Sequence, residues 1–398
     1  MTEEVMLPEE WDIKTLGDVA TITSGGTPSK ANDAYWGGDV PWVRTTEVQN
    51  CYIYEHDIQT YISFEGLKNS SAKLVPDNTI LLAMIGQGKT RGQVALLKLR
   101  ATTNQNCAAI ILHDEQHPEF YFNYLLSQYE NIRNLSNSAG QSNLSGSLVK
   151  SIKVPVPPLP EQEKIAQVLS AWDKAIINIE QLLVKSEQQK QALMQKLLTG
   201  NVRLPGCYGA WRKTRVADIC EIGRGRVISR QEIEANTGNY PVYSSQTLNN
   251  GIMGYINTFD FEGCCVTWTT DGLNAGTVFY RTGKFSCTNV CGTLFARSND
   301  LDLKFLAFAL SRITHKHVSH TLANPKLMNS VMGAIVFSLP ALAEQQKIAS
   351  VLCSADREIN TLQQKLAGLK REKKALMQQL LTGKRRLRIV SASHSAQY

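Results

Sequence analysis

Apolar residues recur every seven positions in two long stretches of the chain. In the first stretch two such rows run in parallel: Ile165, Trp172, Ile179, Leu193 and Leu169, Ile176, Leu183, Leu197. In the second stretch the rows are Ile348, Ala355, Leu362, Leu369, Leu376 and Leu352, Ile359, Leu366, Leu380. Sevenfold spacing sustained over about five heptads is typical of a coiled-coil helix. Each stretch is therefore predicted to be one long helix, and about 39 residues give a rod of about 58 Å.

The ends of these helices are marked by proline and glycine. Pro160 suits a first helical position, and Gly200 and Gly383 suit the left-handed residue that ends a helix. The apolar stripe of each helix can pack into a globular core or against the other helix. We favour pairing, because two matching helices in one chain are at a high effective concentration. Periodicity leaves the relative orientation open. The expected pairing residues are Ile165, Leu169, Trp172, Ile176, Ile179, Leu183, Ile348, Leu352, Ile359, Leu362 and Leu366.

The two helices belong to a tandem repeat. The run that starts Leu159-Pro160-Glu161-Gln162 recurs 183 residues later as Leu342-Ala343-Glu344-Gln345, and residues 192–200 recur as 375–383 at the same spacing. The segments before the helices, 1–158 and 201–341, each have a tryptophan near the start, Trp11 or Trp211, and similar exits. Their interiors have little in common. This pattern suggests one scaffold that performs the same task on two different targets.

The interiors of these segments read as short strands separated by Gly, Asn, Pro and Ser turns. Residues 79–85 and 107–112 are predicted strands, and helices are predicted over 118–131 and 303–313. The predicted fold class is mixed α/β (α+β), with two globular domains alternating with the two long helices. The expected division is a first domain (1–158), a first helix (159–200), a second domain (201–341), a second helix (342–383) and a basic tail (384–398).

The charge is unevenly distributed along the chain. The net charge is +7, but residues 1–200 carry 17 Lys and Arg against 22 Asp and Glu, whereas residues 201–398 carry 25 against 13. A basic half favours a nucleic-acid partner. Much of the excess comes from the second helix and the tail, where a solvated face explains it equally well. Charge therefore suggests DNA without deciding the question.

The composition predicts a globular protein of the cytoplasm. No apolar run approaches the roughly 20 residues that cross a bilayer, and the acidic start lacks the features of a signal peptide. The nine scattered cysteines are expected to be free thiols in a reducing compartment. We expect no membrane partner.

Several loops carry residue types that contact nucleic acid. Arg, Gln and Asn can each make two hydrogen bonds to a base edge, and glycine allows close approach of the backbone. Any one glycine-rich polar loop is more often plain turn chemistry. As candidate DNA-binding residues we single out Gln87, Lys89, Arg91 and Asn143 in the first domain, and Arg224, Arg226, Gln246, Asn249 and Lys326 in the second.

A search for catalytic and metal-binding motifs finds none. Gly88-Lys89-Thr90 suggests a phosphate loop, but the first glycine of that motif would fall at Ala83. Asn324-Pro325-Lys326 is the nearest match to the motif of adenine methyltransferases and lacks its second proline and aromatic residue. The histidines at 315, 317 and 320 and the cysteines at 287 and 291 lack further zinc ligands at suitable spacing. We expect no catalytic residue, no metal and no bound cofactor.

Taken together, the chain resembles the specificity subunits of type I restriction–modification enzymes over almost its full length. The resemblance rests on residues 24–29 and 35–42, on residues 157–162 before the first long helix, and on residues 249–252 and 276–279. It implies an antiparallel pair of helices that hold two target-recognition domains apart. Each domain would read one half of a bipartite, asymmetric site in double-stranded DNA, and the helices would fix the unread spacer.

The resemblance also implies partner subunits that carry the chemistry. Two modification subunits would methylate an adenine in each half-site with S-adenosylmethionine. Restriction subunits would add translocation and cleavage driven by ATP with Mg²⁺.

Two other classes of protein compete with this interpretation. The first is the recognition region of a single-chain restriction–methylation enzyme, which would need methyltransferase motifs that we do not find. The second is a scaffold whose mixed domains bind protein. Protection of DNA by the chain together with its neighbouring gene products would distinguish a specificity subunit from a scaffold.

Overall fold

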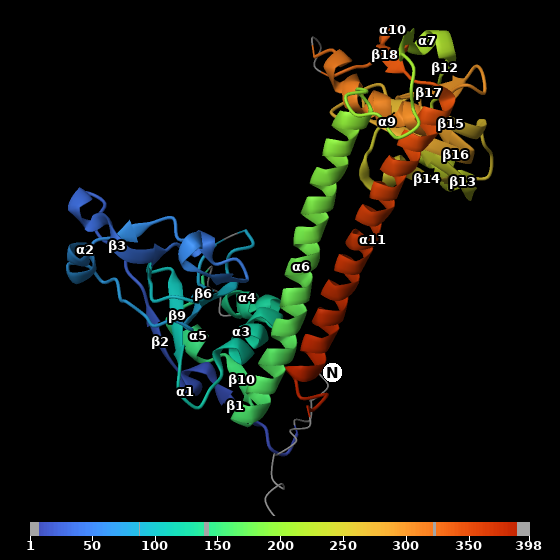
Figure 1. Cartoon of the computed structure of the whole chain (residues 1–398). Helices are drawn as coiled ribbons and strands as arrows, with labels where there is room; N and C mark the ends of the chain where they lie inside the picture. The colour runs from blue at the N-terminus through green and yellow to red at the C-terminus, as the bar shows by residue number, and fades with distance from the viewer. Residues whose placement is uncertain (1–7, 87, 139–142, 321–323, 388–398) are drawn as a thin grey trace, which may run out of the picture. The chain divides into compact units, whose positions relative to one another are not determined.

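The computed structural model describes residues 8–86, 88–138, 143–320 and 324–387 (Figure 1). The chain divides into two compact units, residues 1–179 with 365–398 and residues 180–364. Each unit therefore contains a piece of both long helices, α6 (Leu159–Leu197) and α11 (Leu342–Leu380). The five-part domain division expected from the sequence stays a prediction.

The first unit consists of short strands and helices before α6. Their bounds are β1 Asp12–Thr15, α1 Leu16–Val19, β2 Ala20–Ser24, β3 Trp36–Val43, β4 Cys51–Ile53, β5 Tyr61–Ile62, α2 Phe64–Lys68, β6 Ile80–Ala83, β7 Val94–Leu97, β8 Thr102–Thr103, β9 Cys107–Leu112, α3 Pro118–Ser127, α4 Tyr129–Ser138, α5 Gly146–Lys150 and β10 Lys153–Val156. Three strand groups form, in the orders β2-β9-β6-β7-β4, β5-β3-β8 and β1-β10.

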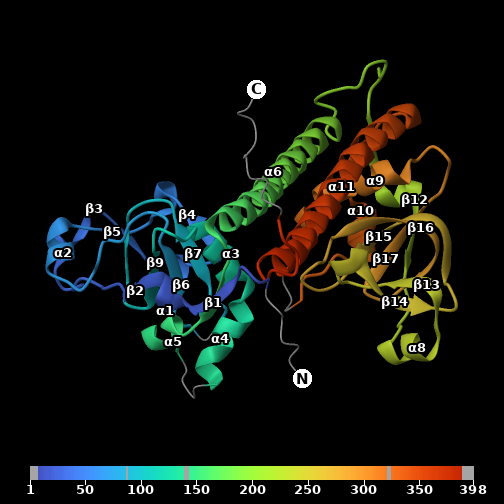
Figure 2. The ribbon, with the colours of Figure 1, turned by 90° about the horizontal axis from the view of Figure 1, so that it is seen from below.

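The second unit repeats much of this order. Its elements are β11 Arg212–Arg215, α7 Val216–Ile219, β12 Cys220–Arg224, α8 Arg230–Ala235, β13 Thr237–Tyr243, β14 Ile252–Ile256, β15 Phe261–Thr269, β16 Val278–Cys287, β17 Cys291–Ala296, α9 Leu303–Ile313, α10 Asn329–Ala334 and β18 Val336–Leu339. The sheet order is β12-β17-β15-β16-β13-β14, with β11 paired to β18. Figure 2 shows α8 beside β14.

The strand registers of the two sheets match across their centres. One row of paired residues crosses four strands in each unit, Ser24–Ala108–Leu82–Val94 in the first and Arg224–Gly292–Trp268–Val278 in the second. The long strand β16 of the second unit takes the place that β7 and β8 together occupy in the first unit. Val43 pairs with Thr103 of β8, and Tyr243 pairs correspondingly with Cys287 of β16. We call these shared elements the frame: β2/β12, β9/β17, β6/β15, α3/α9 and the paired strands β1–β10 and β11–β18.

The long helices begin and end at matching positions of the repeat. Gly200 and Gly383 both adopt positive φ, 75° and 72°, as expected after a helix end. The prediction for 303–313 is confirmed by α9, and the segment 118–131 is helical as predicted but is divided at Gln128 into α3 and α4. The chain turns at Gln128, whose N–H is shared among the carbonyls of the last turn of α3.

Within each unit the helix pieces run antiparallel. In the first unit Lys373 pairs with Asp173, and in the second Lys190 pairs with Asp356 while Ser186 bonds to Glu358. Of the expected pairing residues, Ile165, Leu169, Ile176, Ile179, Ile348 and Leu352 are buried, and Trp172, Leu183, Ile359, Leu362 and Leu366 are half-buried. The residue-by-residue pairing stays a prediction.

The helix ends also join the apolar cores of the units. Ile165 and Leu169 lie in one buried cluster with Met377 and Leu380. Leu352 lies in the corresponding cluster of the second unit, together with Met194 and Leu197. Both arrangements that the sequence left open for the apolar stripes therefore occur. Each helix pairs with its duplicate, and its ends pack into a globular core.

A buried glutamate in the first turn of α6 ties the first unit to its helix. Glu161 is 0% exposed, and its carboxylate accepts hydrogen bonds from the indole N–H of Trp11 at 3.0 Å and from Nε of Arg386 at 2.7 Å. Arg386 also bonds to Glu10 at 2.7 Å. We call this arrangement of tryptophan, glutamate and arginine a clasp.

The second unit contains the same clasp. Glu344 in the first turn of α11 is 4% exposed and accepts from Trp211 at 3.0 Å and from Nε and Nη2 of Arg203 at 2.6 and 2.7 Å. Burial of a carboxylate is tolerated only when it is paired and hydrogen-bonded, and both glutamates meet that condition.

The glutamine that follows each clasp glutamate links the long helix to a shorter one. The side-chain oxygen of Gln162 accepts from the backbone N–H of His117, directly before α3, at 2.9 Å. That of Gln345 accepts from Asp302, directly before α9, at 2.8 Å. The Glu-Gln pair of the repeat thus positions the frame in both units.

Candidate nucleic-acid interface

Two of the predicted DNA-binding cations of the second unit meet at one acid. Nη2 of Arg224 lies 3.1 Å from the carboxylate of Asp271, and Nζ of Lys326 lies 3.5 Å from its other oxygen. Nε of Arg224 donates to the carbonyl of Asn289 at 2.5 Å. This cluster carries one net positive charge and combines the end of β12 with three loops, so it is suited to bind a phosphate.

The loop between β13 and β14 carries the predicted amide side chains. Gln246 and Asn249 are exposed, and the side-chain amide of Gln246 donates to the carbonyl of Ile252. The side chain of Asn274, in the β15–β16 loop, donates to the carbonyl of Ser245 at 3.2 Å. The two loops are therefore joined, and they place polar side chains beside each other.

Arg226 is exposed but held by two acids. Its guanidinium lies 2.7 Å from Glu232 and 3.2 Å from Asp260, and the hydrogen bond to Glu232 raises the pKa of Arg226. An exposed ion pair contributes little stability and is easily exchanged for a phosphate. Arg226 is thus available to a nucleic acid at small cost.

In the first unit the predicted residues lie on and beside the β6–β7 loop. Lys89 and Asn143 are exposed, whereas Arg91 is buried, with 7% of its surface accessible. Gln87 lies outside the described residues. Burial suits Arg91 to holding the loop rather than to reading a base, and the glycine-rich composition of the loop gave no sign of it.

Two residues that hold this loop were not singled out from the sequence. The hydroxyl of Tyr129, in α4, donates to the carbonyl of Lys89 at 2.7 Å. Nη1 of Arg133, one turn later, donates to the carbonyl of Arg91 at 3.4 Å. Their spacing of four is a helical signal, but their contact with a loop about 40 residues away is a tertiary feature.

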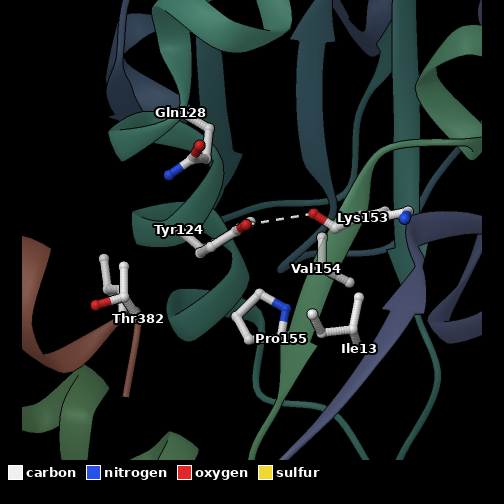
Figure 3. Close-up of a pocket in the computed structure, with 8 residues that line it drawn as sticks. Ile13, Tyr124, Gln128, Lys153, Val154, Pro155 and Thr382 are labelled. Atoms are coloured by element: carbon white, nitrogen blue, oxygen red, sulfur yellow. Dashed lines mark hydrogen bonds between the residues drawn. The ribbon is translucent and has the colours of Figure 1, made fainter. Parts of the chain in front are cut away.

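A pocket of about 240 Å³ in the first unit belongs to the frame. Figure 3 shows that Ile13, Tyr124, Lys153 and Thr382 line it. The hydroxyl of Tyr124 donates to the carbonyl of Lys153 at 3.3 Å, and burial raises the pKa of Tyr124. None of the predicted DNA-binding residues lines this pocket.

In the described part of the chain, no three His, Cys, Asp or Glu side chains are grouped to hold a metal ion, and no helix could cross a bilayer. The nine cysteines are free thiols, and burial raises the pKa of Cys287 and Cys291.

Two units with one frame and different polar loops define a class of protein, a duplicated recognition module. The model of the type I restriction modification DNA specificity domain matches residues 8–187 and again residues 208–371. The chain belongs to this family, whose role is to confer DNA target specificity. Specificity subunits are non-catalytic, and the catalytic activities of the system reside in other subunits.

Individual relatives agree with the family match. A putative type I specificity subunit of Mycoplasma pneumoniae is 37% identical over 214 residues, 53% of this chain and 86% of the relative. The specificity subunit of the type I restriction enzyme MpnII from the same organism is 41% identical over 180 residues, 44% of this chain and 54% of the relative. The crystal structure of a type I restriction–modification S subunit from M. genitalium shares the fold, with a TM-score of 0.65, 17% identity and coverage of 96% and 98% of the two chains.

Proposed function

We propose that this chain reads a bipartite, asymmetric site in double-stranded DNA, with one half-site for each unit. The observation that carries the proposal is the matched frame with unmatched loops. The registers match across the centres of the two sheets, yet Arg224, Asp271 and Lys326 cluster in one unit. In the other unit Lys89 stands on a loop held by α4, and Asn143 lies between α4 and α5. A scaffold that bound one partner twice would have no need of different loops.

The loop residues divide into two proposed roles. Arg224, Arg226, Lys326 and Lys89 bind phosphates, because each is a cation whose side chain is exposed or half-buried. Gln246, Asn249 and Asn143 read bases, because an amide can bond to two atoms of an adenine edge. Gln87 stays in this second group on sequence grounds. Arg91, which is buried, supports its loop.

The remaining parts of the proposal concern the complex in which the chain acts. Two modification subunits methylate an adenine in each half-site with S-adenosylmethionine, and restriction subunits add ATP- and Mg²⁺-dependent translocation and cleavage. The chain itself holds no cofactor and works in the cytoplasm. The continuous helices α6 and α11 set the length of the unread spacer.

The first test is single-molecule methylation sequencing of cells with and without this gene. Loss of adenine methylation at one bipartite motif on deletion is the expected result. An unchanged methylation pattern in cells that express the chain and its modification partner would contradict the proposal.

The second test assigns the residues, with the complex bound to a duplex that carries the motif. Asn249→Ala should cost about 1–3 kcal/mol and relax one base position. Lys326→Ala should weaken binding to all sequences alike. It should also reduce the slope of log affinity against log salt concentration by about one. Lys164→Ala, an exposed lysine of α6, is the control and should change neither. If none of the nine candidates alters affinity or specificity, the loop assignment is wrong.

A further inference from the structure

A buried guanidinium lies beneath the β13–β14 loop of the second unit. Arg281 is 3% exposed, and it lies between two aromatic rings, 3.6 Å from the centroid of Tyr243 and 4.2 Å from that of Phe279. No carboxylate in the described part of the chain pairs with it. Burial lowers the pKa of Arg281, because the charged guanidinium is removed from water.

The hydrogen bonds of Arg281 point at the loop. Nε donates to the hydroxyl of Thr267 at 3.2 Å, and Nη1 donates to the carbonyl of Asn250 at 2.8 Å. A Cβ atom at Gly251 would lie 3.0 Å from Nη2, so the guanidinium fits closely under the turn. The guanidinium of Arg281 thus supports the loop from its buried side.

The turn that Arg281 holds is left-handed. Asn249 and Asn250 have φ values of 50° and 55°, in the region that asparagine adopts more readily than other residues with a side chain, glycine apart. Such conformations persist when the surroundings hold them and are common at binding sites. Both asparagines are exposed, so the turn presents two neighbouring amide side chains to solvent.

The first unit shows that the frame does not require this arrangement. Leu97 lies three residues beyond Val94 in β7, as Arg281 lies three residues beyond Val278 in β16. Val43 takes the register position that Tyr243 takes in the second unit, and Val43 and Leu97 share one buried apolar cluster. An apolar residue is therefore sufficient for folding at this position.

We propose that Arg281 is a positioning residue for DNA specificity, which fixes the Asn249–Asn250 turn so that its amides meet base edges in the half-site read by the second unit. The inference rests on the proposed function. The chemistry recognised is an adenine edge, where an amide bonds to N6 and N7. Arg281 does not touch the base; it removes the freedom of the turn before binding, and pre-organisation of this kind strengthens discrimination.

The test replaces Arg281 by the residue that the frame accepts in the first unit. Arg281→Leu is assembled with the modification subunits, and binding is measured to the duplex with the motif and to duplexes with single base-pair changes in each half-site. We expect discrimination at one or two positions of the second half-site to fall about tenfold. The first half-site and the salt slope should be unchanged, because the phosphate contacts remain. Arg281→Lys, which keeps the charge and a donor, should restore part of the lost discrimination.

Two further variants separate positioning from a general loss of stability. The triple variant, with Arg281→Leu and alanine at Asn249 and Asn250, should lose little more discrimination than the variant with the two alanines alone. The reason is that the three residues act as one unit. Arg297→Leu removes another guanidinium bond, to the carbonyl of Cys220 at 3.0 Å, and should leave discrimination unchanged.

Three results would overturn the inference while leaving the proposed function in place. The first is an Arg281→Leu complex that discriminates like the wild type. The second is one that loses affinity for all sequences together with its thermal stability. The third is an absence of effect from alanine at Asn249 and Asn250. A wild-type complex that binds DNA without sequence preference would instead overturn the proposed function, and the inference with it.

Discussion

The clasps of the two units are alike in nearly every contact, whereas the positions beneath their loops differ in kind. Trp11 and Trp211 each donate to a helix-start glutamate at 3.0 Å. Under the loops, by contrast, Leu97 in the first unit corresponds to the cation Arg281 in the second. The difference teaches that the two copies kept the buried polar contacts that tie each unit to its long helix and diverged at the positions beneath the loops.

The way each loop is supported sharpens the contrast. In the first unit a helix, α4, reaches the β6–β7 loop from outside through Tyr129 and Arg133. In the second unit the support comes from inside the sheet, through Arg281. The two units thus solve the same problem, how to hold a polar loop rigid, with different parts of the chain.

Replacing a clasp glutamate should have the largest effect on stability. Glu161→Ala and Glu344→Ala each leave an indole N–H without its acceptor and take one carboxylate partner from an arginine. We expect each to lower the free energy of unfolding by about 3 kcal/mol, as found when one partner of a buried ion pair is lost. Urea denaturation of the full chain measures it, with the exposed Glu163→Ala as control. A large loss in only one of the two variants would show that the clasps are not equivalent.

Two glycines test the frame at a second place. A Cβ at Gly25 would lie 1.9 Å from the carbonyl oxygen of Thr103, and one at Gly225 would lie 2.1 Å from that of Cys287. Alanine at either position should destabilise the chain by about 2 kcal/mol, because the backbone must move. Thermal unfolding of the full chain measures the loss. Gly146→Ala, where nothing lies within 4 Å of the added Cβ, is the control and should leave the stability unchanged. Tolerance at Gly225 alone would mean that the registers match less closely than the pairing suggests.

Neutralising Asp271 should change DNA binding rather than stability. Asp271→Asn frees Arg224 and Lys326 from their shared acid, so the affinity for any duplex should rise about threefold at low salt, with a steeper salt dependence. Titration at several salt concentrations measures this effect. Glu262→Gln, which removes the partner of Lys284 elsewhere on the unit, is the control. Weaker binding by Asp271→Asn would indicate that the acid itself contacts the DNA.

The smallest effects are expected at the ion pairs between the long helices. Asp173→Asn and Asp356→Asn remove pairs that are partly exposed, and each should cost less than about 1 kcal/mol. The more buried Lys373–Asp173 pair should cost more than Lys190–Asp356. Denaturation at low and high salt measures both, and equal losses at both salt concentrations would contradict a mainly electrostatic contribution.

The two long helices were predictable because they repeat. The heptad rows and the Glu-Gln pair recur at a constant spacing of 183 residues, so the helices α6 and α11 were expected from local pattern alone. The function of the Glu-Gln pair was not, since Glu161 meets Trp11 across 150 residues and Arg386 across 225.

The loops were predictable in composition but not in conformation. Residue types identified Asn249 and Lys326 as candidates, and both lie at the surface or near it. Nothing in the sequence distinguished the exposed Lys89 from the buried Arg91, two residues later on the same loop. Arg281 was missed for a related reason: an arginine within a strand reads as solvent-facing until the rings on either side of it are seen.

The stack around Arg281 has a consequence for exchanging loops between such proteins. A graft that carried residues 244–251 onto the first unit would place the turn over Val43 and Leu97, which offer it neither a ring nor a donor. The portable piece is therefore larger than the visible loop and includes two buried positions far apart in the chain. Recombination that keeps whole units intact would conserve this hidden support, whereas exchange of the exposed segment alone would separate a turn from the residue that gives it its shape.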